Sequence, residues 1–263
     1  MKIYDCFTFF NEFELLELRL NTLNNIVDYF VIVEANKTQK NKDKEFNFEK
    51  NQERFKEYLN KIIYIKVEDM PEFDPACDNE WKLENYQRNC IMRGLNNSQP
   101  EDLVLISDVD EIPNPESILI AQKIEFLDTI PLAFSQSLFY YYMNCRSKGR
   151  WNGSIISKRT NISTPQKLRN LRNLLPALNN GGWHFSYLGG IEKILLKLDS
   201  IVEGPVDMYT PEHIKQCITN GLDIYGRKGA QFEYEFINID QTFPSYTNTF
   251  LKKYPQFYLD KSS

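Results

Sequence analysis

The sequence is most informative at Leu103-Val104-Leu105-Ile106-Ser107-Asp108-Val109-Asp110-Glu111-Ile112-Pro113. The apolar first part, with its β-branched residues, predicts a buried strand, and this strand ends in three carboxylates. Asn114 and Pro115 then predict a helix, with Asn114 as its N-cap and Pro115 at its first position. Ligands of open α/β sheets bind at the carboxyl ends of the strands, so we expect the functional site here.

The acids of this stretch predict a site for a divalent cation. Asp108 and Asp110 are two residues apart, so their side chains leave the same face of an extended chain. Two oxygen ligands on one face can hold Mg²⁺ or Mn²⁺ and leave positions open for substrate phosphates. A lone Asp-x-Asp pair is more often a solvated turn, but the apolar strand and the third acid, Glu111, favour a metal site. Three acids at one sheet edge also repel one another, which disfavours leaving them unpaired.

The composition is that of a globular chain without a nucleic-acid signature. Of the 263 residues 42% are hydrophobic and 14% are aromatic, and 31 basic against 36 acidic residues give a net charge of −5. No basic block stands out, so nucleic acid is not an expected partner. An acidic protein that handles an anionic donor needs a cation to offset the charge, which agrees with the predicted metal site.

The sequence carries no signal for a membrane or for secretion. No apolar run reaches the length of about 20 residues that a membrane span needs, and Asp5, Asn11 and Glu12 interrupt any hydrophobic signal core. The five cysteines form no C-x-x-C pair and are interpreted as free thiols. We therefore expect a cytoplasmic protein. The sequence does not indicate an oligomeric state.

Alternating strand and helix patterns predict an α/β fold. Ile3–Phe9 and Tyr29–Glu34 are predicted buried strands, and an apolar stripe at helical spacing runs from Phe13 to Leu23 between them. Strand, helix and strand in this order form a βαβ unit, which implies parallel pairing. Ile62–Val67 and Asp102–Asp108 add two further predicted strands.

The second half of the chain changes character but is expected to complete the same domain. Ala133–Asn144 is aromatic with polar residues interspersed, which predicts antiparallel strands at the edge of the sheet. The aromatic segment Leu251–Leu259 predicts a C-terminal helix. Because no Gly/Ser/Pro-rich linker divides the chain, we expect a single domain over residues 1–263 with a mixed sheet flanked by helices.

Further candidate site residues lie outside the acidic stretch. His184 lies in an aromatic strand between glycine pairs, as a core residue or as the imidazole that completes a mixed oxygen and nitrogen site for Mn²⁺. Glu192 opens the next helix, as a partner of the helix dipole or as a general base. Lys193 and Lys197 follow one turn apart, either solvated or in reach of a phosphate. Arg88 lies four residues after a glutamate on a predicted helix, in a surface ion pair or facing the cleft.

Four ordered motifs resemble those of one enzyme family. They are Asn11-Glu12-Phe13-Glu14-Leu15-Leu16, Phe30-Val31-Ile32-Val33-Glu34-Ala35-Asn36, Ser107-Asp108-Val109-Asp110-Glu111-Ile112-Pro113 and Gly182-Trp183-His184-Phe185-Ser186-Tyr187. In this order they are similar to the beta-1,4-mannosyl-glycoprotein beta-1,4-N-acetylglucosaminyltransferase family, glycosyltransferase family seventeen. The similarity continues to Ser200 and returns at Phe250-Leu251-Lys252-Lys253-Tyr254. Thr160–Asn180 matches poorly, which leaves the choice of acceptor open.

The resemblance implies a GT-A-type, Rossmann-like fold and a glycosyltransferase activity. Residues 1–112 would form the nucleotide-sugar-binding half, and residues 113–263 the acceptor-side half. The implied reaction is a metal-dependent transfer of a sugar, GlcNAc in first place, from a UDP-sugar to a carbohydrate or other hydroxyl acceptor, with inversion. Two rival interpretations stay open: a metal-dependent phosphohydrolase, and a non-catalytic module that binds sugar nucleotides.

The resemblance and the residue types together assign a role to each candidate. The general base is expected to be Glu192, with Glu111 as the second choice. The cation, Mn²⁺ or Mg²⁺, is expected at Asp108, Asp110 and His184. Contacts with the donor nucleotide sugar are expected from a larger set: Glu34, Asn36, Arg88, Asp108 and Lys193.

Overall fold

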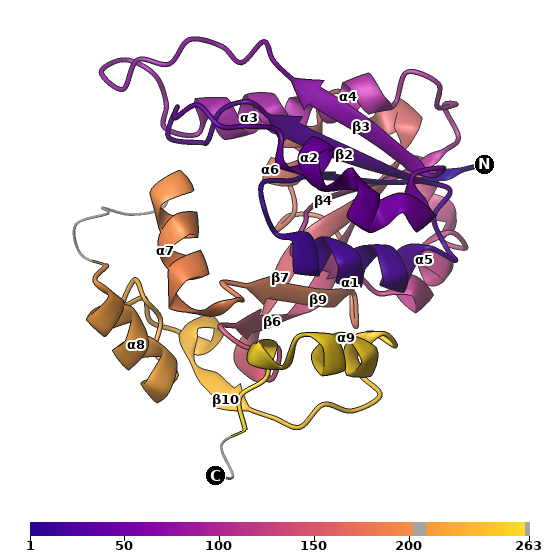
Figure 1. Cartoon of the computed structure of the whole chain (residues 1–263). Helices are drawn as coiled ribbons and strands as arrows, with labels where there is room; N and C mark the ends of the chain where they lie inside the picture. Colours follow the sequence, from indigo (N-terminus) through magenta and orange to yellow (C-terminus); the bar gives the residue numbers. More distant parts are fainter. Residues whose placement is uncertain (202–208, 261–263) are drawn as a thin grey trace.

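A mixed β-sheet forms the centre of the molecule (Figure 1). The computed structural model describes residues 1–201 and 209–260, and within them ten strands join this sheet. The strand order is β3-β2-β1-β4-β7-β6-β9-β5, with β10 beside β7 and β8 beside β6. Four strands pair in parallel: β1 (Ile3–Thr8), β2 (Tyr29–Ala35), β3 (Ile62–Val67) and β4 (Leu103–Asp108). The remaining strands extend the sheet with both parallel and antiparallel pairs. They are β5 (Glu111–Pro113), β6 (Leu132–Tyr140), β7 (Cys145–Lys158), β8 (Ala177–Leu178), β9 (Gly182–Ser186) and β10 (Tyr234–Phe236).

Helices cover both faces of the parallel part because its strands are apolar on both sides. In β1, Ile3 and Phe7 belong to one buried cluster, and Tyr4 and Cys6 belong to the other. The first cluster is closed by α1 (Phe13–Leu23), α2 (Asn47–Asn51) and α5 (Pro115–Ala121). The second is closed by the residues around α4 (Ile91–Gly94), which follows α3 (Lys82–Asn89), and by α6 (Pro165–Asn170). The βαβ order and the parallel pairing predicted from the sequence are confirmed.

The last part of the chain packs against the mixed part of the sheet. It contains α7 (Gly190–Ser200), α8 (Pro211–Asn220) and α9 (Thr247–Lys253), and Figure 1 shows α7 beside the carboxyl edge of the parallel strands. The helix predicted over Leu251–Leu259 is wrong in its bounds. α9 begins earlier, at Thr247, and ends at Lys253, because Pro255 has no backbone N–H and begins a short 3₁₀ turn instead.

The local signals around the acidic stretch hold in the structure. Asn114 accepts a hydrogen bond from the backbone N–H of Glu116 at 3.0 Å, and Pro115 occupies the first position of α5. The α/β architecture with a mixed sheet flanked by helices is confirmed. The division into two halves at residue 112 stays a prediction, and β5 crosses it to pair with β9. Among the described helices none is long and apolar enough to cross a membrane.

Candidate active site

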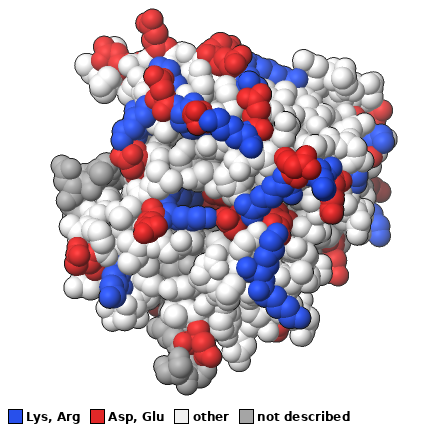
Figure 2. All heavy atoms as spheres, in the orientation of Figure 1, with Lys and Arg blue, Asp and Glu red and all other residues white. Residues whose placement is uncertain are grey.

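A cavity of about 710 Å³ opens at the carboxyl ends of β1 and β4 and extends over β6, β7 and β9. This volume is in the range of small-molecule sites, and the position is that of ligand sites in open α/β sheets. Seven lysines and arginines line it against five aspartates and glutamates, although the whole chain has a net charge of −5. Figure 2 shows lysine and arginine side chains gathered around the middle of this face. The cavity is therefore suited to an anionic ligand.

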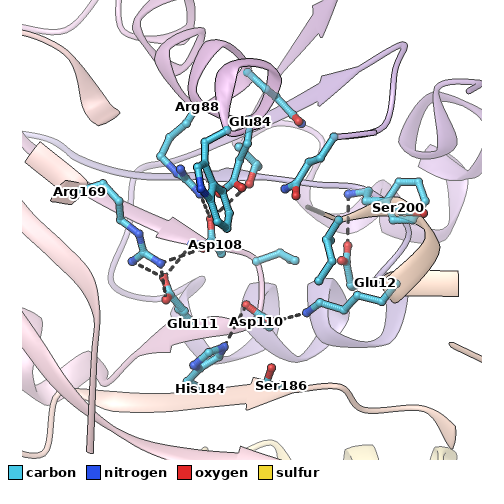
Figure 3. Close-up of a pocket in the computed structure, with 18 of the residues that line it drawn as sticks. Glu12, Glu84, Arg88, Asp108, Asp110, Glu111, Arg169, His184, Ser186 and Ser200 are labelled. Carbon is cyan, nitrogen blue, oxygen red and sulfur yellow. Dashed lines mark hydrogen bonds and ion pairs between the residues drawn. The ribbon is translucent and has the colours of Figure 1, made fainter. Parts of the chain in front are cut away.

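The turn Asp108–Glu111, called the acidic turn below, forms the centre of the cavity wall (Figure 3). Its first member, Asp108, ends β4 and accepts hydrogen bonds from Arg88 and from Arg169, each at 2.8 Å. Burial alone would raise the pKa of Asp108, but the two guanidinium groups outweigh it and hold this pKa well below its ordinary value. Asp108 is therefore a fixed negative charge at neutral pH.

Asp110 faces a different pair of partners, a lysine and a histidine. The ammonium group of Lys197 donates to its Oδ2 at 2.9 Å, and Nε2 of His184 lies 3.6 Å from its Oδ1. Burial again favours the neutral form, but Lys197 first and His184 second lower the pKa of Asp110 far below its ordinary value. The repulsion expected among the three acids is thus offset by Arg88, Arg169 and Lys197.

Glu111 is fully buried and saturated with donors. Its Oε1 accepts from the indole N–H of Trp151 and from Arg169, each at 2.6 Å. Its Oε2 accepts from Arg169 at 2.8 Å and from the backbone N–H of Asp108 at 2.9 Å. A carboxylate in a bidentate ion pair with all its acceptor sites in use cannot take a proton from a substrate. Its expected role as the second-choice base is therefore corrected to one of positioning Arg169 and the acidic turn.

A buried ion pair holds the acidic turn from the side of α1. Arg19 and Asp5 are both inaccessible to solvent and form a bidentate pair with distances of 2.6 and 2.7 Å. The remaining terminal nitrogen of Arg19 donates to the backbone carbonyls of Asp108 at 3.0 Å and Glu111 at 2.7 Å. The sequence reasoning did not identify this pair, because a charged residue on the apolar stripe of a helix gives no signal of its own.

Glu12 is the cavity carboxylate that has no cationic side chain bonded to it. It lies between β1 and α1, immediately before the helix, and its Oε2 accepts the backbone N–H groups of Phe10 at 3.2 Å and Asn11 at 3.0 Å. Within the described residues it forms no ion pair, whereas the other four cavity acids all do. Burial raises the pKa of Glu12; Lys197 counteracts this effect and Asp110 adds to it. A carboxylate with a raised pKa in a cavity is a candidate for proton exchange.

The acidic turn fits a divalent cation that is held largely by the ligand itself. Two ligand atoms about 2.1 Å from one cation lie about 3.0 Å apart at a right angle and farther apart at wider angles. The 3.6 Å between Asp110 Oδ1 and His184 Nε2 agrees with such a pair. In the part of the chain that the structure describes, no three His, Cys, Asp or Glu side chains gather as a metal site. The chain thus offers two ligands, as Mg²⁺ and Mn²⁺ sites that use substrate phosphates do.

Several predicted site residues do meet at the cavity. It is lined by Asp108, Asp110, Glu111, His184 and Arg88, which come from three separate segments of the chain: the acidic turn, β9 and α3. The question of whether Arg88 is a surface or a cleft residue is answered by the structure: it is buried, and it bonds Asp108 and Glu84. The chemical roles of these residues stay predictions.

The expected nucleotide contacts at the end of β2 need correction. Glu34 is fully buried and does not line the cavity. It accepts four hydrogen bonds, from Lys44, from Tyr64 and from the backbone N–H groups that begin α2. Asn36 also lies off the cavity, with its amide donating to a backbone carbonyl at 3.3 Å. Glu34 instead places Lys44, which does line the cavity.

The roles expected for Glu192 as general base and for Lys193 as a donor contact need correction too, because Lys197 is the residue of the three that lines the cavity. Glu192 is exposed and does not line it. Lys193 bonds Glu14 at 2.5 Å and lines only a small neighbouring hollow. Lys197, one turn later, is the residue that reaches Asp110. The helical spacing predicts that these two lysines share a side of the helix, but not which of them meets the sheet edge.

Among the cavity residues that the sequence did not predict, three surround the acidic turn or carry a free carboxylate. Arg169 lies on α6, in the segment that matches the family pattern poorly, although Thr164 and Pro165 form a readable helix start before it. Trp151 lies on β7 and looks like an ordinary aromatic strand residue. Glu12 stands beside the first strand, and only its position after β1 connects it to the site.

The fold and the cavity define an α/β protein with a cavity rich in basic side chains at the carboxyl edge of its sheet, which is suited to an anionic ligand. Comparison with protein families then shows that the chain belongs to glycosyltransferase family 17, whose model matches residues 1–261. The family predicted from the four motifs is thereby confirmed, and so is the glycosyltransferase class at the level of the family.

Curated relatives agree with this assignment over part of the chain. The human and the rat beta-1,4-mannosyl-glycoprotein 4-beta-N-acetylglucosaminyltransferases are each 27% identical over 140 residues. These matches cover 50% of this chain but only 26% of each relative. The chain thus spans about a quarter of the length of the curated relatives it matches.

Solved structures give distant likenesses. The 4-diphosphocytidyl-2C-methyl-D-erythritol synthase of Anaerococcus prevotii has a TM-score of 0.37 at 10% identity, covering 68% of this chain and 86% of that one. The 2-C-methyl-D-erythritol 4-phosphate cytidylyltransferase of Francisella tularensis has a TM-score of 0.34 at 7% identity, with coverages of 68% and 90%.

Proposed function

We propose that the protein is a metal-dependent glycosyltransferase that moves a sugar from a UDP-sugar to a hydroxyl group of a carbohydrate acceptor. The observation that carries this proposal is the excess of positive side chains around the acidic turn, at the carboxyl edge of the parallel strands. In an acidic chain, such a cavity is suited to a diphosphate. Membership of glycosyltransferase family 17 supports a sugar nucleotide as the ligand. GlcNAc as the sugar and inversion as the stereochemistry follow from the resemblance.

The residues of the acidic turn would bind and orient the donor. Asp110 and His184 would hold a Mn²⁺ or Mg²⁺ ion together with the donor diphosphate. When bound, this cation supplies stabilisation of the charge that develops on the departing UDP. Lys197, already at the site, adds a fixed positive charge beside the same phosphates. Asp108 is held by hydrogen bonds from Arg88 and Arg169, so its carboxylate keeps a fixed position in the cavity wall. It would contribute a fixed negative charge to the site.

Glu12 is the carboxylate that best fits the general base. Transfer with inversion requires a group that accepts the proton of the acceptor hydroxyl during the attack. Glu192 lies off the cavity and Glu111 is saturated, whereas Glu12 lines the cavity without an ion pair. Its raised pKa makes it a stronger base than an ordinary carboxylate.

Nucleotide release from a panel of UDP-sugars tests the proposal. The purified protein is incubated with UDP-GlcNAc, UDP-glucose or UDP-galactose and Mn²⁺, with and without simple sugar acceptors. We expect UDP release that acceptors accelerate and that Asp110→Asn reduces about 10²–10³-fold, as expected for the loss of one transition-state contact. Asp199→Asn, in an exposed ion pair of α7, is the matched control and should stay near wild type.

The other outcomes separate the rival interpretations. Release of inorganic phosphate would indicate a phosphohydrolase, and UDP-sugar binding without turnover would indicate a binding module. Full activity in the presence of EDTA would overturn the metal dependence alone, because the transfer itself would still be observed.

A further inference from the structure

Arg172 stands out among the cations of the cavity because its charge has no partner. Arg88 bonds Glu84 and Asp108, and Arg169 bonds Asp108 and Glu111. The side chain of Arg172 makes no hydrogen bond and no ion pair with any residue in the ranges 1–201 and 209–260. The neighbouring carboxylates, Asp108 and Glu111, already form ion pairs with Arg88 and Arg169.

The guanidinium group of Arg172 is nevertheless held in place. It lies over the ring of Trp151, with 5.3 Å between its central carbon and the ring centroid. Trp151 is itself fixed, since its indole N–H donates to the buried Glu111 at 2.6 Å. A guanidinium stacked on an indole keeps its N–H donors in its own plane, where they can meet a planar or tetrahedral oxyanion in two hydrogen bonds.

Leaving this cation unpaired has a cost that an anionic ligand would remove. The side chain is partly buried, and burial together with the neighbouring Arg169 lowers the pKa of Arg172, although an arginine stays charged at any physiological pH. A cation next to other cations in a partly desolvated cavity is poised for a negative partner.

The position of Arg172 points to the acceptor as the source of that partner. The donor phosphates are assigned above to the surroundings of Asp110 and Lys197. Trp151 lies next to both groups: its ring is 5.3 Å from the central carbon of the Arg172 guanidinium and 5.1 Å from the ring of His184. Trp151 belongs to β7, in the mixed part of the sheet, which also lines the cavity with Leu138 and Tyr140 of β6 and with His184 and Ser186 of β9.

We propose that Arg172 is an anion subsite for the acceptor, and that the natural acceptor is a sugar bearing a carboxylate or a phosphate. The proposal rests on the proposed function and names the substrate class of the same cavity. Trp151 serves as the platform that orients the guanidinium, and Arg169 is prevented from taking its place by its own bonds to Asp108 and Glu111.

Pairs of small sugars that differ only in charge provide the test. Binding of methyl glucuronide against methyl glucoside, and of glucose 6-phosphate against glucose, is measured by ligand-observed NMR in the presence of UDP and Mn²⁺. We expect at least one charged member to bind about tenfold tighter than its neutral counterpart, which is the size of one charge-assisted hydrogen bond. Arg172→Gln should abolish this preference, and Arg172→Lys should keep part of it. The affinity for UDP should change less than about twofold in both variants, well within the tenfold scale of one such bond.

A matched control and two opposing outcomes complete the design. Arg150→Gln removes an exposed arginine next to Trp151 that does not line the cavity, and it should leave the preference unchanged. A tenfold loss of UDP affinity in Arg172→Gln would assign Arg172 to the donor and overturn the acceptor subsite. No charge preference in the wild type would also overturn it. Failure of the proposed function gives a different result: the protein would neither bind nor turn over any UDP-sugar, whether or not it prefers charged sugars.

Discussion

The acidic turn and Glu12 face the same cavity, but the carboxylates of the turn are bonded to cationic or polar side chains, whereas the carboxylate of Glu12 is bonded to backbone N–H groups. Each carboxylate of the acidic turn is held by at least two side-chain partners, and Asp108 and Asp110 have pKa values well below the ordinary range. Glu12 accepts only backbone N–H groups, and its pKa is raised. Neighbouring acids whose pKa values are pushed apart have different chemical tasks. The difference suggests that one region fixes charge in space and the other exchanges a proton.

Removing the proton acceptor should have the largest effect on activity. Glu12→Gln keeps the size and the backbone hydrogen bonds, but an amide cannot act as a base. We expect turnover to fall about 10²–10⁴-fold with UDP affinity nearly unchanged. The measurement is UDP release at saturating donor, together with UDP binding by calorimetry.

Stability and a neighbouring variant separate this effect from a folding defect. Because the pKa of Glu12 is raised in the folded state, its ionised form opposes folding above that pKa, so Glu12→Gln should be at least as stable as wild type at pH 8. Glu14→Gln is the control, since Glu14 pairs with Lys193 and does not line the main cavity. Near-normal turnover in Glu12→Gln would remove the proposed contrast between the two regions.

The rigidity of the acidic turn can be tested from its buried support. Asp5→Asn leaves Arg19 buried without its counter-charge, and breaking such a pair typically costs about 3–5 kcal/mol of unfolding free energy. Because Arg19 also bonds the carbonyls of Asp108 and Glu111, UDP affinity should fall as well. Chemical denaturation measures the first effect. Asp199→Asn, whose exposed pair with Lys42 should contribute at most about 1 kcal/mol, is the comparison. Equal losses in the two variants would show that the buried pair does not hold the turn.

Acid should weaken the protein through the charges of the acidic turn. The folded-state pKa of Asp110 is depressed, so its contribution to stability is fully present above the unfolded-state value of about 3.9 and is lost as pH falls toward the folded-state pKa. Asp110→Asn removes that contribution, which we put at about 1–3 kcal/mol at pH 7, the size of a hydrogen bond between charged groups. The gap in unfolding free energy between wild type and variant should stay constant from pH 7 to about pH 5 and narrow progressively as the pH falls below about 4. A gap that does not narrow below about pH 4 would show that the Asp110 charge does not stabilise the fold.

The parallel half of the sheet was predictable from the sequence because its signals are local. β1 to β4 are short apolar runs, and Asn114 and Pro115 mark the next helix, so the strand ends and the acids at the end of β4 could be placed in advance. The same kind of local signal gave a wrong prediction for Glu34, which was expected to contact the donor nucleotide. An acid at a strand end suggests a ligand contact, but here the loop that follows folds back and buries the carboxylate under Lys44 and Tyr64.

The partners of the acidic turn were less predictable because they come from distant segments. Arg169 is 58 residues from Glu111 and Lys197 is 87 residues from Asp110, and neither lies in a motif whose spacing reveals the contact. Which turn of α7 meets the sheet edge depends on Gly189 and Gly190, whose positive φ values of 105° and 85° set the direction of the helix. The pattern of charges along the helix does not determine it.

Lys193 and Lys197 lie one turn apart on α7 and provide the last test, for which we expect the smallest effect. Lys197 bonds Asp110 in the cavity, whereas Lys193 bonds Glu14 outside it. Lys197→Met should weaken UDP binding about tenfold, the size of one charge-assisted contact. Lys193→Met should change it less than about twofold, because Lys193 does not line the main cavity and its partly exposed ion pair with Glu14 lies outside it. Glu192→Gln, on the exposed side of the same helix, should behave like Lys193→Met in both binding and turnover. If Lys193→Met instead weakened UDP binding as much as Lys197→Met, the donor would extend beyond the cavity along α7, and the positive charge that serves the acidic turn would not be confined to Lys197.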